Sequence, residues 1–323
     1  RLYEPGGSFV GTAGKAAGFV RPVLRRVADV ARARKFDLLF VQREAMLFGP
    51  AVFETLMQRI GRLPMVLDLD DATYVAYNSP TYGRLGSSLK FFGKTDRLID
   101  RAAAVTCGNR FIAEYVERRG ARAVVVPTVV DTEVFRPLET PPEDGMTVIG
   151  WVGTHSTFPS LEFLFPVLQD LATKHTFRLR VVGTGRDDLD LPGVEAEFPK
   201  WSLENEVADF RQIDIGLYPI VESPSASEEW LRGKSGFKAV QYMAVGVPFV
   251  MSPVGICAEM GLDGETHISA RSEGDWYNAL DLLLGDVELR RRMGAAGRRY
   301  SLEHFTVEEQ ADKLAEVFRA AGE

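Results

Sequence analysis

The stretch GKSGFKAVQYMAVGVPFVMSPVG, residues 233–255, decides the fold class because it holds a turn, a helix and a buried strand in succession. A glycine turn at Gly236 opens a helical run that continues to Ala244, and Gly246 is placed to end this helix. The run 248–251 that follows is continuously apolar, as in strands that are covered on both faces. A helix that leads directly into such a strand predicts one unit of a parallel α/β sheet.

The same alternation of apolar runs and helical stretches extends over most of the chain. Buried strands are predicted at 37–41, 65–69, 104–107, 123–126, 148–152, 177–182, 213–217 and 248–251. Helices are predicted at 15–34, 50–62, 85–101, 110–119, 161–173, 204–212, 234–245, 276–284, 287–299 and 307–320. Strands that alternate with helices predict an α/β fold with doubly wound, Rossmann-like parallel sheets.

A proline-rich stretch, RPLETPPEDGM at residues 136–146, interrupts this alternation. Its three prolines and its glycine are unsuited to a helix interior, which predicts a linker between two domains. The first domain is predicted to span residues 1–138, and the second to begin at residue 139. Ligands of such folds bind where strand carboxyl ends meet helix N-termini, so we expect a cleft between the two domains.

The composition of the 323-residue chain excludes several classes of protein. A net charge of −7 argues against a nucleic-acid partner, because such partners bind basic surfaces. The only two cysteines, Cys107 and Cys257, exclude a disulfide framework and fit a cytoplasmic protein. The four histidines have no metal-binding spacing, so no metal is expected. No apolar run reaches the roughly 18 residues that a membrane-spanning helix needs.

Two lysines lie at the start of the predicted helix 234–245. Lys234 and Lys238 are four residues apart, a spacing that puts them on one helical face. The N–H groups at a helix N-terminus carry a partial positive charge, so the two lysines and this end of the helix suit a pyrophosphate. The alternative is an ordinary solvent-exposed basic turn, and the residues alone leave both interpretations open.

The pattern KxxxKxxxYMAxGxPxVxSxxG, which begins at Lys234, resembles the donor-binding segment of retaining GT-B glycosyltransferases of the large family-four group, glycosyltransferase group 1. Further similarity follows the family's order at residues 124–137, 148–164, 178–186, 214–220 and 275–297. The resemblance implies the GT-B fold, with two Rossmann-like domains facing a cleft. It also implies a donor domain at 139–306, a final helix 307–323 that returns to the first domain, and a first domain that lacks its initial strands.

The resemblance implies a retaining, metal-independent enzyme that moves a sugar from a nucleoside-diphosphate sugar to an acceptor hydroxyl. The acceptor would be a glycan, glycolipid or protein in cell-surface assembly, and no cofactor is expected. However, Gly233 and Gln241 stand where the family usually has two glutamates. The missing carboxylate could come from Glu222, Glu228 or Glu229 in the preceding loop. The departure leaves a second hypothesis open, a catalytically weak or inactive sugar-nucleotide-binding partner subunit.

The resemblance assigns a donor site at the start of the same helix. Gln241 stands where the family holds the ribose through its hydroxyl groups. Lys238 or Lys234 would neutralise the charge that develops on the leaving diphosphate, which makes Lys238 a catalytic candidate. The backbone that binds the diphosphate corresponds to Ser235, Gly236 and Phe237.

Three further donor-side candidates follow predicted strands of the second domain, and they are Gly153, Thr154 and Arg186. The small residues would let the donor approach the backbone, and Arg186 would lie beside the phosphates. Plain strand-ending turns are the alternative for all three. Trp201 and Glu206 fall where the family usually builds its base pocket, although we interpret Trp201 as a packing residue.

Carboxylates also follow the second predicted strand of the first domain. Asp68 and Asp70 have the spacing of a DxD metal motif, which the resemblance to GT-B enzymes discounts. Asp70 and Asp71 stand where related enzymes place a His-Asp pair, and they are catalytic candidates that bind acceptor hydroxyls or stabilise the transition state. A cap and surface acid for the following turn are the alternative. Asn109, after the third predicted strand, is an acceptor-side candidate.

The basic segment 15–35 carries an apolar stripe formed by Phe19, Val20, Val23, Leu24, Val27 and Val30. Basic amphipathic helices can lie on an anionic membrane, so peripheral contact with the inner face of the membrane is one interpretation. A helix that covers the sheet, interrupted by Pro22, is the other.

Overall fold

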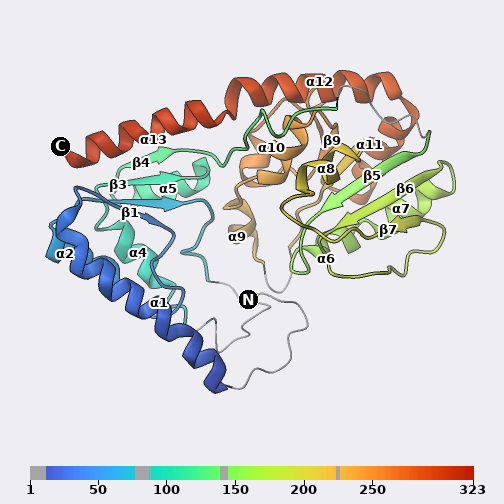
Figure 1. Ribbon diagram of the computed structural model, residues 1–323. Helices are drawn as coiled ribbons and strands as arrows, with labels where there is room; N and C mark the ends of the chain where they lie inside the picture. Colours follow the sequence, from blue (N-terminus) through green and yellow to red (C-terminus); the bar gives the residue numbers. More distant parts are fainter. Residues whose placement is uncertain (1–11, 77–86, 88, 139–144, 223–225) are drawn as a thin grey trace. The chain divides into compact units, whose positions relative to one another are not determined.

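A computed structural model describes residues 12–76, 87, 89–138, 145–222 and 226–323 (Figure 1). The chain forms two compact units. The N-terminal unit contains the described residues up to Val126 together with Leu314–Glu323, and the C-terminal unit is Pro127–Lys313. The last helix, α13 (Val307–Gly322), therefore contributes to both units. Residues 139–144 of the predicted linker lie outside the described residues.

A four-stranded parallel sheet with the order β1-β2-β3-β4 forms the centre of the N-terminal unit. In its register Leu67 pairs with Val41 on one side and with Val105 on the other. Apolar residues dominate the two central strands and are buried on both faces, as expected for a covered parallel sheet. The four strands confirm the predicted ones to within two residues, and they are β1 (Leu39–Gln42), β2 (Met65–Leu69), β3 (Ala104–Cys107) and β4 (Ala123–Val125).

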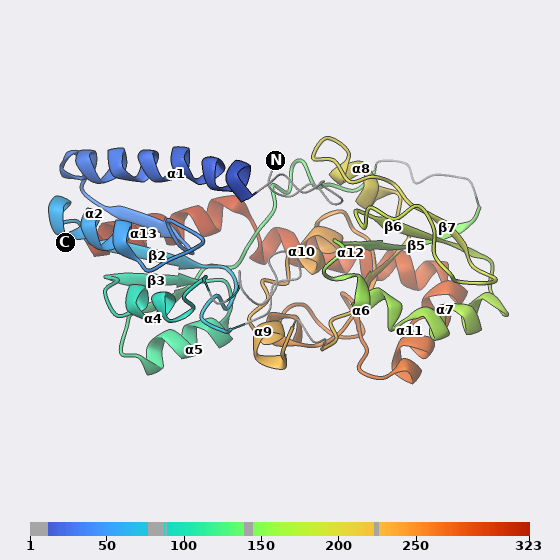
Figure 2. The same cartoon turned by 90° about the horizontal axis from the view of Figure 1, so that it is seen from below.

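Helices cover both faces of this sheet: α13 lies on one side and α4 on the other, and α1 lies beside α2 (Figure 1 and Figure 2). Ala33, Met57 and Leu63 are buried and pack with Leu39 of β1. No helix formed by the described residues is long and apolar enough to cross a bilayer. The bounds are α1 (Thr12–Arg32), the 3₁₀ helix η1 (Ala33–Lys35), α2 (Val52–Gly61), α4 (Gly93–Ile99) and α5 (Arg110–Arg118).

The end of α13 packs on the sheet of the N-terminal unit. Val317 is buried in one cluster with Val66 of β2 and Ala104 of β3. The ring of Phe318 meets the ring of Phe40 edge to face, with 5.1 Å between their centroids. These apolar contacts explain why the last residues of the chain belong to a unit that is otherwise formed by its first residues.

A six-stranded parallel sheet with the order β10-β9-β8-β5-β6-β7 forms the centre of the C-terminal unit. Along the chain, β6 and β7 add to one side of β5. The later strands β8, β9 and β10 add to its other side, so the strand order reverses between β5 and β8. The short strands β7 and β10 were not predicted, because neither contains an extended apolar run. The bounds are β5 (Thr147–Val152), β6 (Phe177–Val182), β7 (Glu195–Glu197), β8 (Ile215–Tyr218), β9 (Phe249–Met251) and β10 (Ile268–Ser269).

Two hydrophobic cores lie on the two faces of this sheet, because successive side chains of a strand point to opposite faces. Phe249 and Met251 of β9 belong to one core, with Tyr242 of α10 (Phe237–Ala244) and residues of α8 (Glu206–Arg211). Val250, between them, belongs to the other core. The helices that close this second core are α6 (Phe158–Glu162), α7 (Phe165–Ala172) and α11 (Glu273–Gly285). The predicted α/β class with two parallel sheets is confirmed.

Two predicted helices are interrupted in the structure. The predicted helix 161–173 is divided into α6 and α7, each of which has a proline in its first turn, where the missing N–H costs nothing. The predicted helix 234–245 begins only at Phe237, because Gly236 adopts the left-handed conformation before it. A separate short helix, α9 (Glu228–Arg232), precedes this turn. The helix α12 (Val287–His304) continues beyond its predicted end.

The segment before the predicted linker is attached to the C-terminal unit. Arg298 of α12 donates hydrogen bonds to the carbonyl oxygens of Thr132 and Phe135, and also to that of Ala244 at the end of α10. Arg211 donates to the carbonyl oxygens of Val134 and Arg136. These bonds explain why the boundary between the units falls at 126/127, ahead of the proline-rich stretch.

Candidate functional site

The carboxyl edge of the C-terminal sheet brings together two of its strand-ending glycines. A Cβ atom added at Gly183 would lie 2.4 Å from the carbonyl oxygen of Gly153. Gly183 also has a φ of 89°, a conformation that favours glycine. Gly153 follows β5, next to the point where the strand order reverses, and such reversal points are where open α/β sheets bind ligands.

The lack of a side chain at Gly153 also has a packing reason. A Cβ atom at this position would lie 2.3 Å from the ring of Trp151. The adjacent Thr154 is exposed, and its hydroxyl pairs with that of Ser156 at 2.8 Å. Both donor-side predictions remain predictions, because close packing alone would account for the glycine.

The helix α10 begins with a turn that only glycine fits without strain. Gly236 has a φ of 66°, and a Cβ atom there would lie 2.7 Å from Ile256 and 2.8 Å from Met260. No side chain caps the N-terminus of α10. Its first N–H groups have no partner within the helix, as at every helix start. The predicted diphosphate-binding turn therefore has the backbone geometry that an anion needs.

Lys238 lies in the first turn of α10, and its ammonium group is near two aromatic rings. Its Nζ atom is 5.4 Å from the centre of the Phe210 ring and 5.8 Å from that of the Phe237 ring. Among the described residues, no carboxylate forms an ion pair with it. Burial disfavours the charged form and lowers the pKa of Lys238 from its ordinary value of 10.5, and the charge of Glu206 opposes this shift. Lys238 is thus a desolvated cation that has no counter-ion within the described part of the chain.

Gln241 joins Lys238 to Glu206. The Nζ atom of Lys238 donates to Oε1 of Gln241 at 3.0 Å, and Nε2 of Gln241 donates to Oε1 of Glu206 at 3.1 Å. An ammonium can only donate and a carboxylate can only accept, so the orientation of the amide is fixed. Gln241 is fully buried, whereas Glu206 is half-buried.

Two other cations predicted for the donor site lie against aromatic rings. Nζ of Lys234 is 5.0 Å from the centre of the Trp230 ring. The guanidinium of the exposed Arg186 is 4.2 Å from the centre of the Phe158 ring. No hydrogen bond or ion pair links Arg186 to α10 among the described residues. The structure thus brings Gly236, Phe237, Lys238 and Gln241 together in α10 and its opening turn.

In the N-terminal unit an arginine forms hydrogen bonds with the carboxylates that follow β2. Arg43 binds Asp70 through Nε and Nη2, the latter at 2.6 Å, and Nη2 also reaches Asp71 at 2.9 Å. Arg43 itself has a φ of 58°, which is uncommon for a residue with a side chain. Sequence reasoning missed Arg43. The available signal was its place directly after β1, since carboxyl ends of neighbouring parallel strands meet at one edge.

Asp68 forms a hydrogen bond with the neighbouring strand. Its Oδ1 atom accepts a hydrogen bond of 2.6 Å from the hydroxyl of Thr106 on β3. Burial raises the pKa of Asp68, and the nearby charge of Asp70 adds to this effect. Among the described residues, no group of three or more His, Cys, Asp or Glu side chains is placed to hold a metal ion.

Asn109 caps the next helix of the same unit. Its side-chain oxygen accepts a hydrogen bond of 2.9 Å from the N–H of Ile112, and the side chain is buried at the start of α5. Asparagine is among the preferred residues at this position. The cap gives Asn109 a structural role, and its predicted role toward an acceptor stays a prediction.

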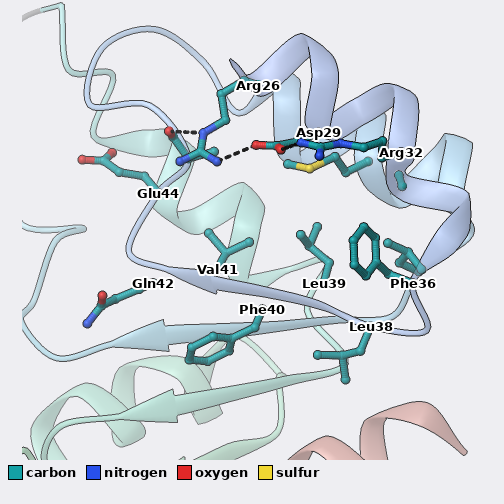
Figure 3. A pocket seen from close by; sticks show the side chains of 14 residues that line it. Arg26, Asp29, Arg32, Phe36, Leu38, Leu39, Phe40, Val41, Gln42 and Glu44 are labelled. Carbon is teal, nitrogen blue, oxygen red and sulfur yellow. Dashed lines mark hydrogen bonds and ion pairs between the residues drawn. The ribbon is translucent and has the colours of Figure 1, made fainter. Parts of the chain in front are cut away.

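A cavity of about 490 Å³ lies elsewhere in the N-terminal unit, between α1 and β1 (Figure 3). Apolar side chains such as Phe36, Leu39 and Val41 line it, and the pair Arg26–Asp29 closes one side at 2.9 Å. None of the predicted site residues contributes to this cavity. Its charged pair is satisfied internally, so we place no chemistry there.

Comparison with known proteins identifies the part of the chain that contains α10. The family model described as "Glycosyl transferases group 1" matches residues 146–286. Residues 146–286, which we call the group 1 segment, are therefore similar to the group 1 glycosyltransferases. The predicted resemblance to this family is confirmed, and the group 1 segment contains Lys238, Gln241 and Glu206.

A curated relative of this chain is the D-inositol 3-phosphate glycosyltransferase of Stackebrandtia nassauensis. The two sequences are 29% identical over an alignment of 226 positions, and the alignment covers 60% of this chain and 47% of that protein. The chain therefore spans about half the length of this relative.

Solved structures share the fold of the whole chain. Anabaena Alr3699/HepE, crystallised with UDP and glucose, aligns over 97% of this chain and 84% of its own, with a TM-score of 0.68 and 16% identity. A glycosyltransferase from Rickettsia africae aligns over 99% of this chain and 84% of its own, with a TM-score of 0.67 and 14% identity. At this identity the likeness shows the fold alone, which confirms the predicted GT-B class.

Proposed function

We propose that this protein is a retaining glycosyltransferase that moves a sugar from a nucleoside-diphosphate sugar to an acceptor hydroxyl. One observation carries the proposal: Lys238 is a desolvated cation in the first turn of α10, and no carboxylate of the described residues forms an ion pair with it. Placing a charge in such surroundings is unfavourable unless an anion completes it. The anion that fits a lysine beside free helix N–H groups is a phosphate.

The proposed chemistry follows from this anion site. The bond between the anomeric carbon and the diphosphate breaks, and negative charge develops on the departing oxygen. Lys238 and the backbone that follows Gly236 would stabilise this charge, which needs no metal. The acceptor oxygen forms the new bond on the same face of the sugar, and its proton passes to the departing phosphate. A UDP complex of the structural neighbour HepE supports a nucleotide donor.

In the N-terminal unit we assign the acceptor side to Asp70 and Asp71. Arg43 holds both carboxylates in place while leaving each with further acceptor capacity. Such carboxylates can bind the hydroxyl groups of a glycan, glycolipid or glycoprotein acceptor. A setting in the assembly of cell-surface glycans follows from the family resemblance and is part of the proposal.

Ligand-induced stabilisation tests the donor proposal. We expect one of UDP, GDP, ADP and dTDP, or its sugar conjugate, to raise the melting temperature of the wild type. Lys238→Ala should weaken binding of that nucleotide by about tenfold or more, since a hydrogen bond to a charged group is worth about 1.5–3 kcal/mol. The matched control is Lys174→Ala, because Lys174 pairs with Asp281 and precedes β6 at the opposite edge of the sheet. Equal nucleotide binding by both variants and the wild type would refute the proposal.

A transfer assay separates an enzyme from a binding subunit. Gly233 ends α9 and has no side chain that could contact a sugar. This is why the second hypothesis, an inactive sugar-nucleotide-binding subunit, also needs a test. With an acceptor mixture of simple glycosides, the enzyme releases the nucleoside diphosphate, and the product keeps the anomeric configuration of the donor. Donor binding without turnover or hydrolysis would favour the inactive sugar-nucleotide-binding partner instead.

We also propose that α1 contacts anionic membranes. Among its described side chains, the large apolar ones that are exposed are Val20, Val23, Leu24 and Val27. From residue 20 to 35 the chain has six basic residues and one acidic residue, Asp29, against a net charge of −7 overall. Flotation with vesicles that contain phosphatidylglycerol tests this contact. Leu24→Asp should abolish flotation, and equal recovery with neutral vesicles would refute the electrostatic part.

A further inference from the structure

The bridge formed by Gln241 has a consequence for the identity of the residue at position 241. A carboxylate could accept from Lys238 but could not donate to Glu206, so only an amide can join the two groups. A glutamate at 241 would also put two negative charges at the 3.1 Å separation that the amide now bridges. Glutamine at 241 and glutamate at 206 therefore form a matched pair, and the negative charge lies on α8.

Glu206 has capacity for a ligand that Gln241 lacks. Gln241 is fully buried, and both ends of its amide are occupied. Glu206 is half-buried and uses Oε1 for Gln241, and its Oε2 forms no hydrogen bond with any residue in the described part of the chain. A carboxylate with a free oxygen binds the adjacent hydroxyl groups of a sugar ring, which donate to it.

We infer that Glu206 reads the hydroxyl groups of the nucleotide's pentose and that Gln241 is the positioning residue that holds it. The inference rests on the proposed function, since the diphosphate beside Lys238 brings the pentose within reach of its neighbours. It moves the role that the family resemblance gives to position 241 onto a different helix. Glu206 would favour nucleotides that have both pentose hydroxyl groups, and Lys238 would favour nucleotides that have a diphosphate. Because different residues make these two contacts, each preference can be tested by itself.

Three probes separate the two selections: UDP, 2′,3′-dideoxy-UDP and inorganic pyrophosphate, each titrated calorimetrically into the full chain. The wild type should bind UDP about tenfold or more tightly than the dideoxy analogue. Glu206→Gln should lose most of this discrimination, whereas pyrophosphate affinity should stay within about threefold. The matched control is Glu204→Gln, because Glu204 is an exposed carboxylate two residues away. It should behave as the wild type.

The double variant tests the pairing. Gln241→Glu alone should weaken UDP binding, because its carboxylate faces that of Glu206. Glu206→Gln combined with Gln241→Glu restores one amide and one carboxylate, and it should bind UDP more tightly than the sum of the two single effects predicts. Gln241→Leu should lower the discrimination against the dideoxy analogue without loss of pyrophosphate affinity.

The outcomes distinguish this inference from the proposed function. If UDP and pyrophosphate both fail to bind the wild type, the proposed function fails and the inference fails with it. If both bind but Glu206→Gln keeps the wild-type preference for UDP over the dideoxy analogue, only the inference is overturned. Additive effects in the double variant would also overturn the pairing of positions 206 and 241.

Discussion

The N-termini of α5 and α10 are comparable in position but differ in how their polar groups are paired. Each helix follows the carboxyl edge of a parallel sheet in its own unit. In the N-terminal unit Asn109 caps α5, and Arg43 forms ion pairs with the neighbouring carboxylates of Asp70 and Asp71. In the C-terminal unit Gly236 gives α10 no side-chain cap, and Lys238 has an amide in place of a counter-ion.

This difference indicates which of the two helix N-termini binds a ligand. The side chains of Asn109 and Arg43 have partners within the N-terminal unit, so folding alone explains how these two residues are placed. At the start of α10, folding has desolvated a cation and left the helix N–H groups without a cap, which is unfavourable for stability. Unfavourable local features are expected at functional sites. Replacement of Asn109 or Arg43 should therefore affect stability, whereas replacement of Gly236 or Lys238 should affect nucleotide affinity.

Replacement of the two N-cap residues by alanine should produce the largest effect on stability. Gly236→Ala should lower the free energy of unfolding by about 1–3 kcal/mol, because of its positive φ and its contacts with Ile256 and Met260. Asn109→Ala should cost about 1 kcal/mol through the lost cap. Nucleotide affinity should fall in Gly236→Ala alone. A normal affinity in this variant would show that the turn does not shape the anion site.

Methionine at the two cationic positions sharpens the same comparison. Arg43→Met should lower stability by about 1–2 kcal/mol, because Asp70 and Asp71 lose their shared partner. Lys238→Met should change stability by less than about 1 kcal/mol, since relief from desolvation offsets the lost bond to Gln241. Its UDP affinity should nevertheless fall by tenfold or more.

Tryptophan fluorescence assigns these changes to one unit. All four tryptophans, at positions 151, 201, 230 and 276, belong to the C-terminal unit. Urea unfolding followed by fluorescence should therefore be unchanged in Arg43→Met, whereas circular dichroism should report an earlier transition. A shift of the fluorescence transition in Arg43→Met would contradict independent stabilities of the two units.

The elements that the sequence predicted well are those whose signal is local. The four strands of the N-terminal unit follow from apolar runs, and α10 follows from apolar spacing between two glycines. The two missed strands, β7 and β10, lack such runs and form because an edge of an existing sheet is available to them. Proline in the first turn of α7 was a local signal that was not used, and it separates α6 from α7.

The candidate site shows the same limit more sharply. Lys238 and Gln241 were predicted from one segment, and they lie within one turn of α10. Arg43 was missed because its partners are 27 and 28 residues away, at a strand end that only the sheet brings near. The bond between Gln241 and Glu206 spans 35 residues, so the physical reason for glutamine at 241 became visible only in the folded chain.

The smallest expected effect is a pH dependence that distinguishes the two units. Burial lowers the pKa of Lys238, so the unfolded chain holds this proton up to about pH 10.5 while the folded chain releases it earlier. In that alkaline window the unfolded state binds more protons, and stability gained from this group rises with pH. A bound diphosphate favours the charged lysine, so UDP affinity should move the opposite way and fall as pH rises through the lowered pKa. The phosphates are already ionised above pH 7 and do not contribute.

Lys238→Arg is the matched control, because a guanidinium stays charged throughout this range. Calorimetric titration with UDP from pH 7 to 10.5 should show proton uptake on binding and a loss of affinity of up to about tenfold in the wild type, and neither in Lys238→Arg. The same titration with Arg43→Lys should follow the wild type, since Arg43 lies in the other unit. A wild-type affinity that stays constant to pH 10.5 would mean that Lys238 is not the cation that meets the diphosphate.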